Sequence, residues 1–231
     1  MNKFYNEYDK FLVAVDCIIF GFDEGELKLL LIKRNFPPVQ GEWSLMGGFL
    51  KKRESLDDAA SRVLQRLTGL SNVYLEQLYS YGEINRDPGA RVMSVAYYAL
   101  IKIKDYDEEL VRKHNANWFP INDFPDLIFD HNIMVDRALK RLRRKAQSQT
   151  IGFELLPDKF TIPQLQSLYE AIFQKNFDKR NFRKKILSFD VLKKFNEKEK
   201  KNSKKGAFLY QFNRDKYNDL IDSGYSFEFN V

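Results

Sequence analysis

The stretch GGFLKKRESLDDAASRVLQRLTGL, residues 47–70, constrains this chain more than any other part of its sequence. Gly48, Glu54, Arg62 and Gly69 lie in it at spacings that suit a glycine turn, then a loop, then a helix. The stretch therefore predicts a loop–helix unit with a fixed internal geometry.

The helix of this unit has signals at both ends. Ser55 suits the N-cap position, and Asp58 follows it three residues later. Gly69 stands just past the last helical position, where a left-handed residue commonly ends a helix. We therefore predict a helix over residues 55–69.

Runs with the apolar content of strands surround this unit. The first two are separated by DEGE and read as a hairpin, and a later pair is separated by the Pro-Gly turn NRDPGA. The predicted strands cover residues 11–22, 26–34, 73–84 and 91–103.

The composition excludes several classes of protein. No run of about 18 apolar residues occurs, so we expect no membrane span, and the N-terminus lacks the pattern of a signal peptide. Cys17 is the only cysteine, which excludes a disulfide framework and a zinc site built on cysteines. It lies in the apolar run VAVDCIIF, where we expect a buried small hydrophobe. These features fit a cytoplasmic protein.

An amphipathic helix is predicted over residues 130–147, with a basic C-terminal end that suits the helix dipole. Its expected apolar positions are Ile133, Ala138, Leu139 and Leu142. A polar stretch at residues 146–152 follows, and we place the domain boundary there. The expected domains are residues 1–148 and residues 152–231.

The second domain has a different order of predicted helices and strands. FTIPQLQSLYEAIF begins with Thr161 as a predicted N-cap, and Gln164 completes a capping box. After a short turn, Asp178 is the predicted N-cap of a second helix. Two short strands, SFDVLKKF and GAFLYQFN, follow and are joined by a lysine-rich loop. Two helices, a tight turn and a basic hairpin describe a winged helix-turn-helix.

Positive charge is concentrated in this second domain. Residues 179–205 hold 12 Lys and Arg against 3 Asp and Glu, which indicates a polyanionic partner. In a winged helix the second helix enters the DNA major groove, and its first residues reach the bases. Phe182, Ile186 and Leu187 are its expected buried face. The predicted DNA-binding residues are Lys179, Arg180, Asn181, Arg183, Lys184, Lys204 and Lys205. The alternatives are a solvated basic face and an adaptor that binds protein.

The stretch of residues 47–70 resembles the Nudix box, the signature of a family of pyrophosphate hydrolases. The residues in register are Gly48, Glu54, Arg62, Leu64, Gly69 and Leu70. In active members, carboxylates one helical turn apart converge on Mg²⁺. Here those positions carry Val63, Arg66 and Leu67, none of which ligates Mg²⁺. The resemblance therefore implies a Nudix scaffold with no metal site, no cofactor and no enzymatic activity. It also implies an ion pair between Glu54 and Arg62 that holds the loop against the helix.

The whole chain resembles the NrtR family of Nudix-related transcriptional regulators. Segments such as YGEINRDPGARVMSVAYYALI and FTIPQLQSLYEAIFQKNFDKRNFRKKIL carry the likeness. It implies an α+β chain, in which an N-terminal Nudix α/β/α sandwich with a mixed sheet precedes a C-terminal winged helix-turn-helix domain. It also implies a homodimeric repressor that leaves operator DNA when a small effector binds.

The missing carboxylates favour the sugar-responsive branch, which resembles the L-arabinose regulator AraR. We therefore expect a pentose, L-arabinose, as the effector. A regulator of NAD metabolism that senses ADP-ribose is the alternative, since Arg66 could attract phosphate directly. A Nudix hydrolase with residual pyrophosphatase activity is a further one.

The effector pocket is expected beside the Nudix loop and the first strands. Its candidate residues are Asp16, Lys33, Trp43, Gly47, Arg66 and Glu83. Each has a plainer interpretation: Asp16 as a partner of backbone amides, Trp43 as core, and Lys33 and Glu83 as surface charges. His131 is expected to cap or pack the helix at residues 130–147 rather than to act as a catalyst.

Overall fold

The computed structural model describes residues 7–23, 25–105, 109, 113–149, 151–200, 206–225 and 227–229. The chain forms two compact units. The first contains residues 1–20, 29–99 and 106–138, and the second contains residues 21–28, 100–105 and 139–231. The division of the sequence into domains at residues 1–148 and 152–231 stays a prediction.

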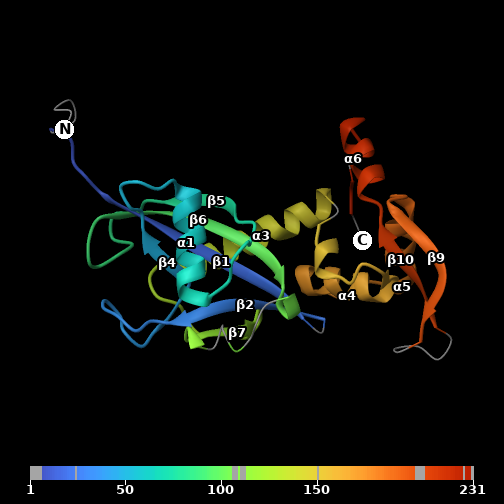
Figure 1. Cartoon of the computed structure of the whole chain (residues 1–231), viewed down its shortest axis with the longest axis horizontal. Coiled ribbons are helices and arrows are strands. Elements are labelled where there is room, and N and C mark those ends of the chain that lie inside the picture. The colour runs from blue at the N-terminus through green and yellow to red at the C-terminus, as the bar shows by residue number, and fades with distance from the viewer. Residues whose placement is uncertain are drawn as a thin grey trace. The chain divides into compact units, whose positions relative to one another are not determined.

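A sheet of seven strands is built from the N-terminal half of the chain (Figure 1). Its main path runs in the order β3-β2-β1-β6-β5, while β4 pairs with β1 and β7 pairs with β2. The strands are β1 (Leu12–Asp23), β2 (Glu26–Lys33), β3 (Trp43–Ser44), β4 (Met46–Phe49), β5 (Glu76–Tyr81), β6 (Val92–Lys102) and β7 (Ala116–Pro120). β1 is buried along most of its length, and Cys17 lies in its core with no exposed surface, as predicted.

Helix α1 (Leu56–Thr68) lies across one face of the sheet and packs on β4 (Figure 1). Ser55 and Asp58 form the predicted capping box, and Gly69 ends the helix in the left-handed conformation. Ala59, Ala60, Val63 and Leu64 form its buried stripe. Asp57 in the first turn of α1 accepts a hydrogen bond from the hydroxyl of Tyr97 at 2.6 Å. Burial raises the pKa of Tyr97 most, and this hydrogen bond raises it further.

Helix α3 (His131–Ser148) corresponds to the helix predicted over residues 130–147. Its buried apolar positions are Met134, Val135, Ala138, Leu142 and Ala146. Ile133 was expected on the apolar, buried side of this helix, and that expectation was wrong, because its side chain is 57% exposed. The buried stripe begins one residue later, and Ile133 lies on the outer side of the helix. A 3-10 turn at Ile103–Asp105 follows β6, and another at Phe153–Leu155 follows α3.

The C-terminal part of the chain is a winged helix. Helices α4 (Ile162–Phe173) and α5 (Lys179–Ser188) are followed by the hairpin β9 (Leu192–Glu199) and β10 (Ala207–Phe212), and β10 also pairs with the short strand β8 (Phe160–Thr161). Thr161 and Gln164 form the predicted capping box, and Asp178 caps α5 by accepting from the amide of Asn181. The α+β class and the winged helix are thereby confirmed.

Two details of the winged helix differ from expectation. Phe182 and Ile186 are buried as predicted, but Leu187 is 37% exposed, and Phe189 just after the helix is buried instead. β9 extends to Glu199, four residues beyond the predicted strand, since cross-strand pairing with β10 holds Lys198 and Glu199 in the ladder.

Residues beyond the hairpin add an element that the sequence did not indicate. Helix α6 (Arg214–Asp222) has no buried residue, yet the segment after it returns to the core. Phe227 and Phe229 are 1% and 3% exposed. The ring of Phe229 lies against aromatic rings of α4 and α5, and its amide donates to the carbonyl of Gln147 at the end of α3 at 2.8 Å. Within the described ranges, no helix has the length and apolar content needed to cross a bilayer.

Candidate functional site

A cavity of about 710 Å³ opens in the first unit beside β1, β4 and α1. The loop after β2, the turn before β6 and the start of α3 complete its wall. Its basic lining residues are Arg34, Lys51, Arg62, Arg66 and Arg86, and its acidic ones are Asp16 and Asp87. This volume is typical of a site for a small organic ligand, and the lining carries more positive than negative groups.

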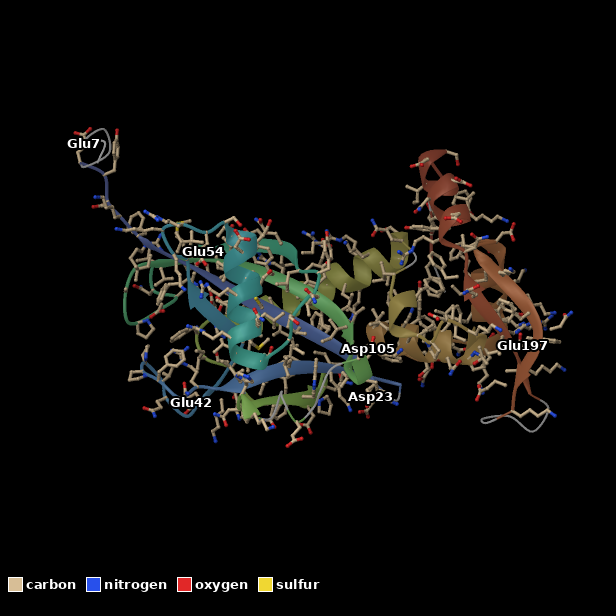
Figure 2. All side chains as sticks on the ribbon, viewed as in Figure 1. Glu7, Asp23, Glu42, Glu54, Asp105 and Glu197 are labelled. Atoms are coloured by element: carbon tan, nitrogen blue, oxygen red, sulfur yellow. The ribbon has the colours of Figure 1, made fainter. Side chains whose placement is uncertain are left out.

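The predicted ion pair between loop and helix is present. Glu54, labelled in Figure 2 beside the N-terminal end of α1, accepts from Arg62 at 2.6 and 2.8 Å and from the amide of Lys51 at 2.7 Å. Arg62 also donates to the carbonyl of Phe49 at the end of β4. The hydrogen bond from Arg62 lowers the pKa of Glu54 to about 2. Both oxygens of Glu54 are therefore engaged in bracing the loop.

The three positions that ligate metal in active Nudix enzymes hold no carboxylate. Val63 is completely buried and packs beneath Gly48, where a Cβ atom would lie 2.7 Å from its Cγ2. Arg66 is exposed and lines the cavity together with Leu67. Across the described part of the chain, no group of three or more His, Cys, Asp or Glu side chains could hold a metal ion. The residues present do not fit a Mg²⁺ site of the Nudix type.

Asp16 lies at the buried end of the cavity and belongs to a polar cluster. Its Oδ2 accepts from the hydroxyl of Ser94 at 2.5 Å and lies 3.7 Å from Nη2 of Arg86. Arg86 in turn donates to both oxygens of Asp130, at 2.7 and 2.9 Å. Burial opposes the charge on Arg86, but the bond to Asp130 and the nearby Asp16 raise its pKa. The partners of Asp16 are therefore side chains, and the expected backbone amides are not among its hydrogen bonds in the described ranges.

His131, the first residue of α3, closes the cluster. Its Nδ1 accepts from the amide of Leu45 at 3.2 Å, and its Nε2 lies 3.6 Å from Oδ1 of Asp16. Burial lowers the pKa of His131. A neutral ring whose Nδ1 is an acceptor carries its proton on Nε2, facing Asp16. His131 thus has the packing role that the sequence indicated.

The outer wall of the cavity is the loop after β2. Arg34 donates through Nε to the carbonyl of Pro38 at 3.1 Å, and its guanidinium lies 4.1 Å from the ring centre of Phe36. Burial lowers the pKa of Arg34, although the nearby Asp87 and Asp16 counteract this. The loop therefore offers a half-buried cation and a partly exposed aromatic ring to a ligand.

The cavity includes only part of the predicted effector set. Asp16, Gly47 and Arg66 line it. Lys33 is exposed and lies 5.8 Å from the ring centre of Trp43, and the Trp43 ring also packs edge-on against Phe119. Glu83 is exposed, and its carbonyl accepts from Arg91.

Sequence reasoning missed three basic residues of the cavity. Arg34, Lys51 and Arg86 come from three separate loops, and no spacing rule links them. The only signal was their position: Arg86 lies in the turn NRDPGA and Arg34 follows directly on a strand. The roles of all the effector candidates stay predictions.

The second candidate site is the N-terminal end of α5. Lys179, Arg180, Asn181, Arg183 and Lys184 are all exposed there. Arg183 also donates to the hydroxyl of Tyr210 on β10 at 3.2 Å, which ties the helix to the wing. Of the predicted wing residues, Lys204 and Lys205 lie outside the described residues.

The described part of the wing carries its own cations. Lys194 and Lys198 lie 4.0 and 4.5 Å from the ring centre of Phe208, and Lys193 lies 5.6 Å from that of Phe195. These three lysines are exposed on β9. Contacts with the rings hold the ammonium groups along the hairpin, where they suit the phosphates of a nucleic acid.

Comparison with known families matches both parts of the chain. Residues 10–140 match the NUDIX domain, and residues 152–212 match the NrtR DNA-binding winged helix domain. The expectations of a Nudix scaffold with a mixed sheet and of a winged helix domain are thereby confirmed.

Three relatives illustrate the likeness. The ADPR responsive transcriptional repressor NtrR of Acinetobacter baylyi is 34% identical over 211 residues, which cover 90% of this chain and 84% of that protein. The ADP-ribose pyrophosphatase of Methanocaldococcus jannaschii is 33% identical over 136 residues, 58% of this chain and 76% of that protein.

The third relative has been solved in two complexes. Shewanella oneidensis NrtR with a 27mer DNA superposes with a TM-score of 0.77 at 29% identity, over 95% of this chain and 99% of that one. Its NUDIX domain with ADP ribose superposes with a TM-score of 0.50 at 30% identity, over 62% of this chain and 99% of that one. Both domains are thus matched in the same order along one chain, and the protein belongs to the NrtR family of Nudix-related transcriptional regulators.

Proposed function

We propose that this chain is a transcriptional repressor that binds operator DNA through α5 and the wing, and leaves it when ADP-ribose occupies the Nudix cavity. The observation that carries the proposal is the pairing, on one chain, of a basic recognition helix with a basic cavity at a Nudix loop. We propose a homodimer, because a two-fold operator requires two recognition helices. The protein would act in the cytoplasm, where its DNA is.

ADP-ribose fits the cavity better than the L-arabinose expected from the sequence. A neutral pentose leaves the charges of Arg34, Lys51 and Arg66 without a counter-charge, whereas a diphosphate supplies one. The comparisons give the sugar branch no support, and two of the relatives are named for ADP-ribose. The comparisons therefore favour ADP-ribose sensing, which the sequence analysis gave only as the alternative.

A DNA-binding assay with the region upstream of the chain's own operon tests the proposal. Fluorescence anisotropy should show saturable binding that ADP-ribose reverses and L-arabinose does not. Release by L-arabinose alone would restore the sugar interpretation. No binding to that DNA, with binding to a protein partner instead, would favour the adaptor.

A residual hydrolase is the second candidate, and the likeness to an ADP-ribose pyrophosphatase is the observation that favours it. The donor set opposes it, because Glu54, the carboxylate that remains in register with the Nudix box, is held by Arg62 and Lys51. Incubation of ADP-ribose with the protein and Mg²⁺ should therefore leave ADP-ribose intact. Turnover that disappears in Glu54→Gln would show that the hydrolytic site survives.

A further inference from the structure

We propose that Arg66 takes the place of the metal ion of a Nudix site, so that the cavity binds a diphosphate group directly and without Mg²⁺. The identity of the ligand as ADP-ribose rests on the proposed function. The diphosphate chemistry rests on the cavity itself and is tested separately below.

The first step concerns what the helix face offers. Positions 63, 66 and 67 lie on one side of α1, at the spacing that brings three side chains together. Mg²⁺ requires oxygen ligands, but two of these side chains are apolar and the third is a cation. The completely buried Val63 fills the space beneath Gly48. This face therefore repels a divalent cation and attracts an anion.

The second step concerns the freedom of Arg66. Within the described residues it makes no hydrogen bond and no ion pair, and it lines the cavity. A Cβ atom at Gly48 would lie 3.5 Å from its Nη2, so the absence of a side chain there lets the guanidinium lie against the backbone of β4. A planar guanidinium donates two parallel hydrogen bonds to phosphate oxygens and supplies one of the two positive charges that Mg²⁺ would bring.

The third step compares the other charges of the cavity. Arg62 is bound to Glu54 and Arg86 to Asp130, so neither has its full charge to offer. Of the two carboxylates, Asp16 accepts from Ser94 at the buried end, and Asp87 accepts from the amide of Gly89.

Lys51 forms no ion pair within the described ranges and lies in the loop directly after β4, the strand that contains Gly48. An anion is therefore favoured at the α1 side of the cavity, next to Arg66 and Lys51, and disfavoured beside Asp16.

Calorimetric titration of the full-length protein tests this with two probes, ADP-ribose and inorganic diphosphate, each in excess EDTA and in excess Mg²⁺. Wild-type protein should bind both probes in EDTA, with no gain in affinity when Mg²⁺ is added. Arg66→Ala should weaken both by roughly 10- to 100-fold, the loss expected for hydrogen bonds between charged groups. Arg66→Lys should recover part of the loss, because it restores the charge but not the two-pronged geometry.

Arg53→Ala is the matched control, since Arg53 is an exposed arginine near the same loop that does not line the cavity. It should bind both probes like the wild type. Equal weakening by Arg53→Ala and Arg66→Ala would reduce the effect to net charge and overturn the proposal. Because Arg66 is exposed, its loss should leave the unfolding temperature unchanged, which separates binding from folding.

The outcomes distinguish this inference from the proposed function. Binding of ADP-ribose that requires Mg²⁺, or that survives Arg66→Ala unchanged, overturns the role of Arg66 and leaves ADP-ribose as the effector. Binding of diphosphate but not of ADP-ribose supports the role of Arg66 and excludes ADP-ribose as the effector. If neither probe binds, both the role of Arg66 and ADP-ribose as the effector are overturned.

Discussion

Asp16 and Gly47 face each other as register partners on the antiparallel strands β1 and β4, and a Cβ atom at position 47 would overlap Oδ1 of Asp16. Asp16 cannot easily move away, because Ser94 donates to its other oxygen and Arg86 lies beside it. The glycine is therefore required by a buried carboxylate, in addition to any role it has toward a ligand.

Gly47→Ala should consequently destabilise the protein by about 1–3 kcal/mol, the usual range for overpacking. Chemical denaturation measures this directly. Gly82→Ala is the control, because its Cβ would meet only the end of Met93, at 3.8 Å. A Gly47→Ala protein as stable as the Gly82→Ala protein would show that Asp16 shifts freely.

The second prediction concerns the pH dependence of the brace between loop and helix. Arg62 lowers the pKa of Glu54 from 4.5 to about 2. A carboxyl group whose pKa is lower in the folded state stabilises the fold above its unfolded pKa, and this stabilisation is lost as the pH falls through the folded value. The difference in free energy of unfolding between wild type and Glu54→Gln should therefore be constant above pH 4.5 and shrink toward about pH 2.

Denaturation of both proteins at a series of pH values measures that difference. Glu42→Gln is the control, because Glu42 is exposed and its side chain has no hydrogen bond in the described part of the chain. It should show no such trend. A difference for Glu54→Gln that stays constant down to pH 2 would contradict the assigned pKa shift.

Local signals in the sequence were enough to place the caps and the brace. Glu54 and Arg62, both capping boxes and the cap at Asp178 depend on residues a few positions apart, and chain geometry alone brings such residues together. The buried stripe of α3 was misjudged at Ile133 because apolar character does not reveal which side of a helix meets the core.

The cavity and the C-terminal segment could not be predicted in this way. Arg34 and Arg86 line the same cavity because of the order of strands in the sheet, and the sequence does not encode that order locally. Phe229 follows an exposed helix and a turn, so its sequence neighbours suggest a loose end. Its burial depends on rings contributed by α4 and α5, more than 40 residues away in the chain.

The third prediction concerns this C-terminal segment. Phe229 contacts the rings of Tyr169, Phe173, Phe182 and Phe189, so Phe229→Ala should remove about 3–5 kcal/mol of stability, as for other buried aromatic residues. Thermal unfolding of the full-length chain measures the effect. Tyr225→Ala, at a ring that is 42% exposed, should cost much less. Equal effects would show that Phe229 does not belong to the core.

The fourth prediction separates base contacts from phosphate contacts. Arg180 is exposed at the first turn of α5, and Arg180→Ala should weaken specific DNA binding by about 1–3 kcal/mol while sparing non-specific binding. Lys194→Ala in the wing should weaken binding to every sequence and reduce its salt dependence. Arg214→Ala, an exposed residue of α6, is the control for net charge. If Arg180→Ala and Lys194→Ala had the same profile, the assignment of α5 to the groove would be wrong.

The last prediction concerns how the two sites communicate. His131 lines the cavity at the first residue of α3, and Asp130 just before it holds Arg86. The same helix ends at Ser148, and Arg143 near that end donates through Nε to the carbonyl of Ile172 in α4 at 3.0 Å. One continuous helix thus carries a cavity residue at its start and a hydrogen bond to the winged helix near its end.

If α3 transmits the effector signal, thermodynamic linkage requires that operator DNA weakens ADP-ribose binding by the same factor by which ADP-ribose weakens operator binding, about 1.4 kcal/mol for each tenfold. Arg143→Ala should bring this factor close to one, because it removes the bond between α3 and α4, while each ligand alone still binds within about twofold of wild type. Arg144→Ala is the matched control, since Arg144 is the next residue on the helix and is exposed. Titrating ADP-ribose into the protein with and without operator, for all three proteins, measures the factor. An Arg143→Ala protein with full coupling would mean that the signal travels by another route, and unequal factors in the two directions would mean that the ligands do not act on one equilibrium.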